Sequence, residues 1–255
     1  MSEGYFKGVT LLITHYNRSR SLERLIKGFA ALNCSFERIV VSDDSSKEAH
    51  LIYIRELQKI YRFELITTKI NKGLGNNLNK GLDAIKTPFT LYVQEDFIPM
   101  PSFPSIFENA LEIINERADI DMVRFYAYFK FPYLKPYRNG FSEMKFKLWY
   151  LGYKKFYCYS DHPHLKRNNF IEKFGPYFES KNSDLTEYKM MIKFLQNKGK
   201  AMFYDAYTEV FNQENTSTEP STIKRNWLRE SNNYFIISIR EAYRFLKFNL
   251  DYLRK

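Results

Sequence analysis

Residues 9–29, "VTLLITHYNRSRSLERLIKGF", decide the fold class because their hydrophobic period changes partway along the stretch. Residues 9–14 are a nearly continuous apolar run. The apolar residues that follow share one face of a helix: Leu22, Leu25, Ile26 and Phe29. A short apolar strand followed by an amphipathic helix is the unit from which parallel sheets are built. We therefore expect a strand over 9–14 and a helix that starts near Ser21.

The same alternation continues through the first half of the chain. It predicts strands over 38–42, 63–68 and 89–93, and helices over about 47–61, through Leu78 to Ile85, and over about 102–116. Beyond them we expect a strand over 122–129, an aromatic region without regular periodicity, a helix from about 183 that ends at Gly199, and a strand over 201–205. This order indicates an α/β fold with a mostly parallel sheet flanked by helices.

Bulk properties limit the function and the compartment. The 39 Lys and Arg exceed the 29 Asp and Glu by ten, which favours anionic partners such as nucleic acid, phosphorylated small molecules or an anionic membrane. Cys34 and Cys158 have neither disulfide-framework nor zinc-site spacing, so a reducing compartment fits best. The apolar run near the N-terminus is too short for a signal peptide. We expect a cytoplasmic protein, soluble or peripheral at the inner face of the membrane.

Polar residues follow all four predicted strands of the first half. In chain order they are Thr14, His15, Tyr16, Asn17 and Arg18; Asp43 and Asp44; Asn71, Lys72 and Gly73; and Glu95 and Asp96. In an open α/β sheet, ligands bind outside the carboxyl ends of the strands. We therefore expect these residues to meet at one edge of the sheet and to form the ligand site.

Two of these strand ends carry paired acids, which suit a divalent cation. Carboxylate oxygens bind Mg²⁺ or Mn²⁺, and such an ion completes its shell with water and phosphate oxygens. For Asp43 and Asp44 the alternative is a turn with a helix N-cap, since Asp is favoured there. For Glu95 and Asp96 the alternative is a solvated loop before Pro99.

The order of four motifs resembles the N-terminal half of glycosyltransferase family 2. The motifs are "VTLLITHYNRSRSLERLIKGF", "ERIVVSDDSS", "NKGLGNNLNKGLDAI" and "TPFTLYVQEDFIP". The resemblance covers about the first 100 residues well and the remaining 155 in outline. It implies a GT-A fold, with a Rossmann-like sheet that binds a nucleotide-diphospho-sugar in residues 1–100, an acceptor-binding half in 101–220, and a separate tail over 221–255.

The resemblance also assigns roles on the donor side. Thr14 and Tyr16 match residues that flank the nucleotide base, and Asp44, with Asp43 beside it, matches the acid that contacts base or ribose. Asp96 falls on the last acid of the family's D-x-D-like motif, which implies a Mn²⁺ or Mg²⁺ ligand supported by Glu95. The nucleotide-sugar site also includes Asn17, Asn71 and Gly73. Asn77 and Leu78 stand where the family pattern has Ala and Arg, so one expected electrostatic contact is missing.

In the second half the resemblance places a catalytic base at the start of a helix that ends in glycine. "LTEYKMMIKFLQNKG" puts Glu187 at that position, with Tyr188 where Asp is usual and Asp184 as the alternative. The competing interpretation is a capping box in which Asp184 is the N-cap and Glu187 reaches back. Asn212 and Gln213 stand where a metal-binding histidine often follows, whereas His162 and His164 fit an acceptor shelf or a structural role better than a metal site.

The tail predicts an amphipathic helix with two stripes. One is apolar (Ile239, Tyr243, Leu246, Leu250, Leu253) and the other is charged (Arg240, Arg244, Lys247, Asp251, Arg254). One interpretation lays the helix on an anionic membrane surface. The other packs it on the protein's own core or on a second subunit, with the charged face in water.

These observations lead to one expected function and two alternatives. We expect a metal-dependent glycosyltransferase that moves a sugar, most simply from UDP, to the hydroxyl of a glycan or lipid-linked acceptor; the resemblance implies inversion. One alternative is a basic, aromatic-rich nucleic-acid-binding module. Paired acids at strand ends would repel a polyanion, so we expect no nucleic-acid partner. The other is a sugar-phosphate nucleotidyltransferase, whose Gly-rich loop is missing from "THYNRSRS".

Overall fold

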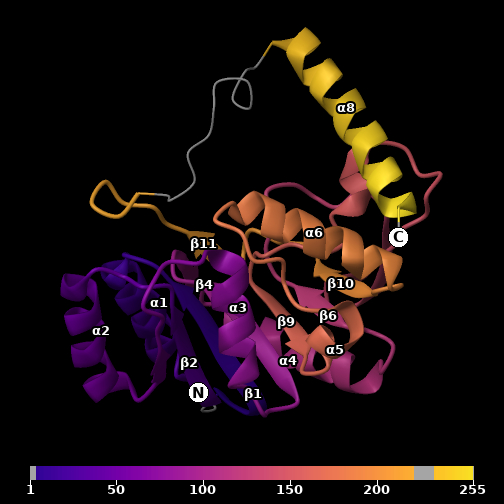
Figure 1. The fold of residues 1–255 in the computed structure, drawn as a ribbon. Helices are drawn as coiled ribbons and strands as arrows, with labels where there is room; N and C mark the ends of the chain where they lie inside the picture. Colours follow the sequence, from indigo (N-terminus) through magenta and orange to yellow (C-terminus); the bar gives the residue numbers. More distant parts are fainter. Residues whose placement is uncertain (1–3, 221–232, 255) are drawn as a thin grey trace.

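The computed structural model describes residues 4–220 and 233–254, and its centre is a nine-stranded sheet (Figure 1). The strand order is β3-β2-β1-β4-β9-β6-β10-β8-β7. The bounds are β1 Gly4–His15, β2 Cys34–Asp43, β3 Glu64–Ile66, β4 Phe89–Gln94, β6 Met122–Arg124, β7 Leu134–Arg138, β8 Phe141–Met144, β9 His164–Arg167 and β10 Ala201–Tyr204. All but β8 and β9 run in the same direction, so the expected α/β fold with a mostly parallel sheet is confirmed.

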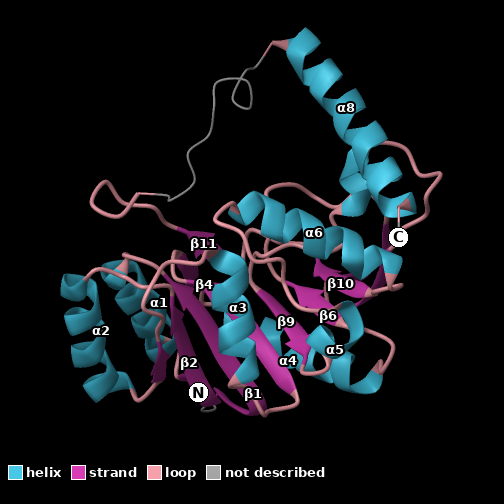
Figure 2. Ribbon diagram, in the orientation of Figure 1, coloured by secondary structure: helices cyan, strands magenta, loops and turns pink. Residues whose placement is uncertain are grey.

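Helices cover both faces of this sheet (Figure 2). Their bounds are α1 Ser19–Ala31, α2 Glu48–Tyr61, α3 Leu74–Asp83, α4 Phe103–Glu116, α5 Phe170–Phe174, α6 Ser183–Gln196 and α8 Tyr234–Leu253, with a 3₁₀ helix η1 at Tyr153–Phe156. Successive side chains of a strand point to opposite faces. Leu11 and Ile13 therefore pack in one core with α1, α2 and α4, whereas Leu12 packs in a second core with α3, α5 and α6.

Two sequence predictions in the middle of the chain are wrong. The strand predicted over 122–129 ends at Arg124, and the aromatic region predicted to be irregular contains β7, β8 and β9. β9 pairs antiparallel with both β4 and β6 and so joins the two halves of the sheet. Its sequence, "HLKR", has no apolar period, because its charged side chain Lys166 is fully buried and held by partners from distant segments.

The register brings the ends of the first strands to one edge. Thr14 lies opposite Ser42 of β2 and Gln94 of β4, so the residues that follow each strand emerge side by side. A small second sheet closes this edge, in which β5 (Phe97–Pro99) pairs antiparallel with β11 (Phe211–Gln213). The expected convergence of polar residues at the carboxyl ends is therefore confirmed, and β11 adds residues from the far end of the chain.

The glycines of the 71–81 stretch serve close packing between the two halves. Gly73 has φ +90° at the start of α3, and a Cβ there would lie 2.0 Å from the carbonyl oxygen of Ser180. At Gly75 a Cβ would lie 2.2 Å from the carbonyl oxygen of Phe178. The chain over 178–181 thus rests on the first turn of α3, and only glycine leaves room for it.

We predict that Gly75→Ala destabilises the protein by about 1–3 kcal/mol, although alanine is the better helix former, because the added methyl displaces a backbone carbonyl. Urea denaturation measures the change. Asp83→Ala, at an exposed position in the same helix, is the matched control and should stay within about 0.5 kcal/mol. Equal stability of the two variants would contradict the close seating of the 178–181 segment.

Candidate active site at the carboxyl edge of the sheet

A buried hydrogen bond joins the ends of β1 and β2. His15 Nδ1 lies 2.8 Å from Asp43 Oδ1, and the backbone N–H of Arg18 donates to His15 Nε2 over 3.1 Å. Nε2 is thus an acceptor, which makes Nδ1 the protonated nitrogen that donates to Asp43. The imidazole is held in one tautomer and fixes the turn that leads from β1 into α1.

Asp43 is an interior residue. Its carboxylate also accepts hydrogen bonds from the Ser46 hydroxyl and backbone N–H and from the Thr67 hydroxyl, and Lys80 Nζ binds its carbonyl oxygen at 2.5 Å. Burial opposes ionisation of this carboxyl group, but the hydrogen bonds from His15 and Ser46 outweigh it and lower its pKa to about 2. Asp43 therefore organises the strand ends as a fixed anion.

Asp44 orders the loop before α3. Its two carboxylate oxygens accept hydrogen bonds from the backbone N–H groups of Lys72 and Gly73 at 2.9 and 2.8 Å. Its own N–H donates to the carbonyl of His15, which also accepts from the side-chain amide of Asn77. The predicted residues Asp44 and Gly73 are thus in direct contact at the carboxyl edge. Asn77, in place of the family's Ala, has a structural role there.

The other predicted donor-side residues surround these contacts. The Thr14 hydroxyl lies 3.0 Å from the Tyr92 hydroxyl. Asn17 has φ +54°, donates its N–H to Ser46, and accepts from the N–H of Lys47 through Oδ1, which ties the loops after β1 and β2 together. Tyr16 and Asn71 are half-buried in the loops at the same edge.

Glu95 and Asp96 form the turn between β4 and β5, and both face Arg18. The Arg18 Nη1 lies 3.5 Å from a Glu95 oxygen and 3.3 Å from Asp96 Oδ2. Gln213 of β11 donates to the same Asp96 oxygen at 3.0 Å, and the Glu214 N–H donates to the Asp96 carbonyl. All of these charged side chains are almost fully buried, so the interpretation of Glu95–Asp96 as a solvated loop is wrong.

The electrostatics of this pair favour a cation. Burial and the neighbouring Asp96 raise the pKa of Glu95 to about 8, although Arg18 opposes the shift. Residues 4–220 and 233–254 contain no group of three or more His, Cys, Asp and Glu side chains placed to hold a metal. Two adjacent carboxylates still fit Mg²⁺ or Mn²⁺, because such ions commonly use one or two protein carboxylates and complete their shell with phosphate and water.

Residues 215–219 bind Arg18 and the first turn of α1. The carboxylate of Glu219 accepts hydrogen bonds from the backbone N–H of Arg20 and from the N–H and hydroxyl of Ser21, in the first turn of α1. Arg18 Nη2 donates to Asn215 Oδ1 at 2.7 Å and to the Glu219 carbonyl. An acid at a helix N-terminus satisfies free N–H groups and complements the helix dipole.

Glu187 lies on α6 and faces the body of the protein. Its Oε1 accepts the backbone N–H of Asp161 at 3.2 Å, and the Ser160 hydroxyl also hydrogen-bonds to its carboxylate. Burial raises the pKa of Glu187, whereas these hydrogen bonds and Arg124 oppose the shift. The predicted capping box is wrong: Asn182 is the N-cap and accepts from the Leu185 N–H, with Asp184 in the first turn.

A short series of contacts connects Glu187 with Asp96. Ser160 Oγ lies 2.9 Å from His162 Nδ1, and the His162 ring packs edge-on against Tyr128, with 4.5 Å between ring centroids. The Tyr128 hydroxyl donates to Gln213 Oε1, and Gln213 in turn donates to Asp96. Burial lowers the pKa of His162 to about 3, so this ring is neutral. The predicted acceptor-shelf histidine therefore lies between the two candidate acids.

A buried chain of hydrogen bonds connects Asp161 with Lys166. Lys166 Nζ lies 2.9 Å from the Tyr177 hydroxyl. The Tyr177 and Tyr159 hydroxyls are 2.8 Å apart, and the Tyr159 hydroxyl donates to Asp161 Oδ1 at 2.5 Å. Burial lowers the pKa of Lys166 to about 7, although the nearby Asp161 opposes this shift. Burial and the nearby Glu187 raise the pKa of Asp161 to about 8. Asp161 Oδ2 has no hydrogen-bond partner among the described residues.

Sequence reasoning did not predict several residues of this site. It assigned no role to Tyr128, Asp161 or Lys166, and it named Arg18 and Gln213 only by their positions, without their contacts to Asp96. The contacts that place them at this site include pairs 11 to 201 positions apart, and nothing in the local pattern indicates such pairs. The stretch "HPHLKRNN" that contains Lys166 is mostly polar, so it gives no local indication of a buried strand.

Comparisons with known proteins agree with the fold and the strand-end motifs. The model of the family "Glycosyl transferase family 2" matches residues 10–175. A poly-beta-1,6-N-acetyl-D-glucosamine synthase of Staphylococcus epidermidis is 22% identical over 92 residues, which is 36% of this chain and 22% of that protein. The chain therefore matches only about a fifth of the length of this relative.

Solved structures with a similar fold include two nucleotide-sugar complexes. TarS 1–349 of S. aureus with UDP-GlcNAc has a TM-score of 0.59 at 14% identity, covering 84% of this chain and 61% of that one. The mannosyltransferase PcManGT of Pyrobaculum calidifontis with GDP-Man and Mn²⁺ has a TM-score of 0.53 at 12% identity, covering 76% and 53%. At these identities the likeness shows the GT-A fold. With the family match over residues 10–175, it shows that the chain belongs to glycosyl transferase family 2.

Proposed function

We propose that this chain transfers a sugar from a nucleotide-diphospho-sugar to an acceptor hydroxyl, with Glu187 as the base. The observation that carries the proposal is the series of contacts from Asp96 through Gln213, Tyr128 and His162 to Glu187. It connects the two candidate acids, Asp96 and Glu187, through a region lined by aromatic rings, which supports the proposal. Membership of the family supports this reaction class.

The donor nucleoside would bind at the ends of β1 and β2. Asp44 would contact the base or ribose, with Thr14 and Tyr16 beside it and Asn17, Asp43, Asn71 and Gly73 shaping the surrounding loops. Uridine is the first choice, because the similar TarS structure holds UDP-GlcNAc. Guanosine is the second, because PcManGT holds GDP-Man.

Asp96, supported by Glu95, would hold Mn²⁺ or Mg²⁺. Such an ion would stabilise negative charge on the departing diphosphate. Arg18 lies against both acids and adds a second positive charge at the same place. Gln213 fixes the orientation of the Asp96 carboxylate, as hydrogen-bonded neighbours of metal ligands generally do.

Glu187 would take the proton of the acceptor hydroxyl while its oxygen attacks the anomeric carbon and the bond from that carbon to the diphosphate breaks. Direct displacement of this kind inverts the anomeric centre. The residue is half-buried and the pKa of its carboxyl group is raised, so its ionised form is a stronger base than an exposed glutamate. Asp184, one turn earlier on α6, is the alternative base.

The acceptor class we propose is a glycan or a lipid-linked precursor, and the compartment is the cytoplasm. Residues 1–100 would form the donor half and 101–220 the acceptor half, with 221–255 as a tail.

A thermal-shift screen with nucleoside diphosphates and nucleotide sugars, with and without Mn²⁺, tests the function. A ligand that binds only the folded protein raises its apparent stability. We expect UDP or a UDP-sugar to stabilise the chain, and more strongly with Mn²⁺. If no nucleotide shifts the transition, the proposed function is wrong.

Asp96→Asn should weaken the apparent Mn²⁺ affinity in the presence of UDP by at least about tenfold, because it removes the main charged ligand. Calorimetric titration of Mn²⁺ into the protein–UDP mixture measures the affinity. Glu95→Gln is the matched comparison and should have the smaller effect. A larger loss for Glu95→Gln would reverse the assigned roles.

Glu187→Gln should reduce sugar transfer by about a hundredfold or more while donor binding persists, because the amide cannot accept the proton. Transfer is followed by release of the nucleoside diphosphate, and donor binding by thermal shift. Asp184→Asn is the matched control and should stay within a few-fold of the native rate. The opposite ranking would make Asp184 the base.

Asp161→Asn should change how stability depends on pH. The native-state pKa of Asp161, about 8, lies above its unfolded value of 3.8, so its contribution to stability is full below pH 3.8 and is lost as pH rises through about 8. Relative to the native chain, Asp161→Asn should therefore gain about 1 kcal/mol or more between about pH 5 and about pH 8 in urea denaturation.

Tyr159→Phe provides the control for that experiment. It removes the hydrogen bond to Asp161 but keeps the titrating carboxyl group. Its stability should still fall as pH rises over this range. If Asp161→Asn and Tyr159→Phe show the same pH dependence as the native chain, Asp161 is not the titrating group.

A further inference from the structure

The helix α8 packs on the protein through a mixed face that combines its charged stripe with Phe245, Phe248 and Tyr252, and it leaves an apolar stripe on its outer side. Arg244 donates to the Tyr153 hydroxyl at 3.2 Å, and the Tyr188 hydroxyl donates to Asp251 at 2.5 Å. Lys247 forms an ion pair with the same Asp251, and Phe248 is buried against the rings of Tyr153 and Tyr188. The alternative that packs this helix on the protein's own core agrees with these contacts, but its charged stripe is largely half-buried and does not lie in water as expected.

The apolar side of α8 faces outward along its whole length. Its residues are spaced by three or four and expose half or more of their surface: Phe235 (73%), Ile239 (55%), Tyr243 (62%), Leu246 (62%), Leu250 (53%) and Leu253 (62%). We call these six residues the outer stripe. At 1.5 Å per residue, the 20-residue helix presents a strip about 30 Å long. Soluble surfaces rarely leave so continuous an apolar strip uncovered.

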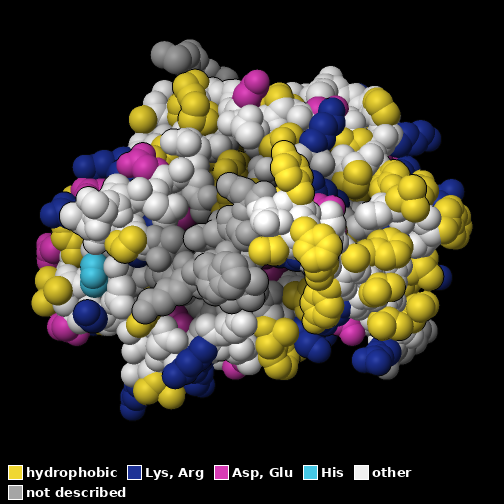
Figure 3. Space-filling model, turned by 90° about the horizontal axis from the view of Figure 1, so that it is seen from above, with side chains coloured by type: hydrophobic (Ala, Val, Ile, Leu, Met, Phe, Trp, Pro, Cys, Tyr) yellow, Lys and Arg dark blue, Asp and Glu magenta, His cyan; other side chains and the backbone are white. Residues whose placement is uncertain are grey.

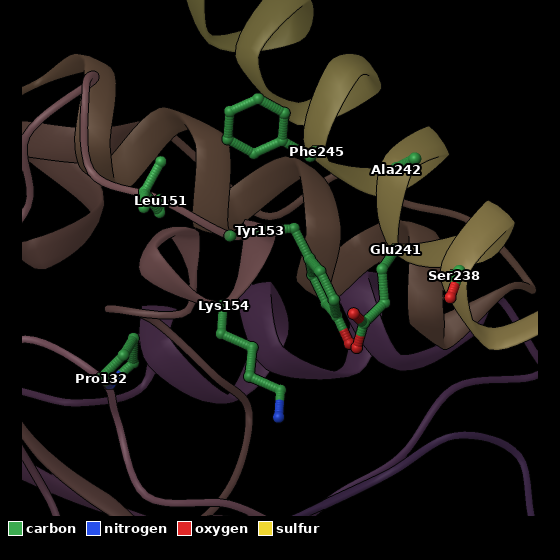
Figure 4. A pocket seen from close by; sticks show the side chains of 9 residues that line it. Pro132, Leu151, Tyr153, Lys154, Ser238, Glu241, Ala242 and Phe245 are labelled. Carbon is green, nitrogen blue, oxygen red and sulfur yellow. The ribbon is translucent and has the colours of Figure 1, made fainter. Parts of the chain in front are cut away.

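A neighbouring loop extends the outer stripe. Trp149 and Leu151 are 75% and 80% exposed, and Lys155 Nζ ties their loop to α8 by binding the Tyr150 carbonyl and the Asn249 side chain. Between loop and helix lies a pocket of about 600 Å³, whose lining includes Leu151, Tyr153, Glu241 and Phe245 (Figure 4). Seen from above, apolar side chains gather on this side, with basic side chains around them (Figure 3).

We propose that the outer stripe, with Trp149 and Leu151, docks on an anionic lipid surface with the α8 axis in the membrane plane. Large aromatic and aliphatic side chains on one face, with basic residues beside them, are the pattern of interfacial helices. Lys147 and Arg254 are exposed beside the apolar surface, and the chain carries a net charge of +10. Charge complementarity therefore favours anionic lipid over a second, equally basic copy of this chain.

This docking would orient the active site. α8 is attached to α6 through Tyr188, the residue next to Glu187, and it lies on the side of the molecule where the strands of the sheet end (Figure 1). If the chain has the proposed function, an acceptor carried by a lipid would then approach along the surface that holds the base, Glu187. No helix in residues 4–220 or 233–254 is long and apolar enough to span a membrane, so contact through these residues would be lateral.

Flotation of the full chain with vesicles tests the proposal. We expect binding to vesicles of phosphatidylcholine mixed with phosphatidylglycerol, weak binding to phosphatidylcholine alone, and loss of binding at high salt. Leu246→Ser with Leu250→Ser should reduce the partition coefficient by about tenfold or more, because two exposed leucines no longer enter the lipid. Lys147→Gln with Arg254→Gln should reduce it several-fold on anionic vesicles only.

The matched control is Ile52→Ser with Ile60→Ser on α2, which removes two exposed isoleucines away from α8 and should leave binding unchanged. The proposal is overturned if the chain does not float with anionic vesicles, or if the Leu246/Leu250 variant floats like the native chain. It is also overturned if the native chain is a dimer in solution and this variant a monomer, because a second copy then covers the stripe. Nucleotide-induced thermal shifts of both variants report on the proposed function separately.

Discussion

The buried contact between His15 and Asp43 is the constraint on which the carboxyl edge depends. It joins the two central strands at the point where their backbones separate into loops. Both loops take their conformation from it, because Arg18 donates to the far side of the imidazole and Ser46 shares the carboxylate. A buried carboxylate with all of these partners is a fixed negative charge. The Lys80 side chain and the backbone N–H of Ser46 are positioned around this charge.

The corner around Arg18 shows how one cation can organise two acids. Glu95 and Asp96 would repel each other in a buried turn, and the guanidinium between α1 and β5 offsets that repulsion. Its other nitrogen reaches residues 215 and 219, so the last segment before the tail is fastened to the same point. The acids are therefore oriented before any ligand arrives, which reduces the cost of ordering them on binding.

The first half of the fold could be predicted from sequence because its signals are local. The strand at 9–14, the helix with Leu22 and Phe29, and the acids that follow Val93 are each defined by neighbouring residues. β9 could not be predicted, because its place depends on Lys166 meeting Tyr177 and Tyr159 from other elements. The capping interpretation of Asp184 and Glu187 failed for the same reason. Glu187 binds residues 160 and 161, which are distant in sequence, and not the start of its own helix as the local motif predicts.

The close seating of the 178–181 chain on α3 has a mechanical consequence. Gly73 and Gly75 leave no free space between the loop that Asp44 holds and the segment that leads into α6. Two backbones in such contact cannot move past each other, so the 71–73 loop and the 178–181 segment act as one rigid joint. A displacement of the 71–73 loop would therefore also displace the segment that leads into α6. A movement of either segment would then be transmitted to the other through steric contact alone.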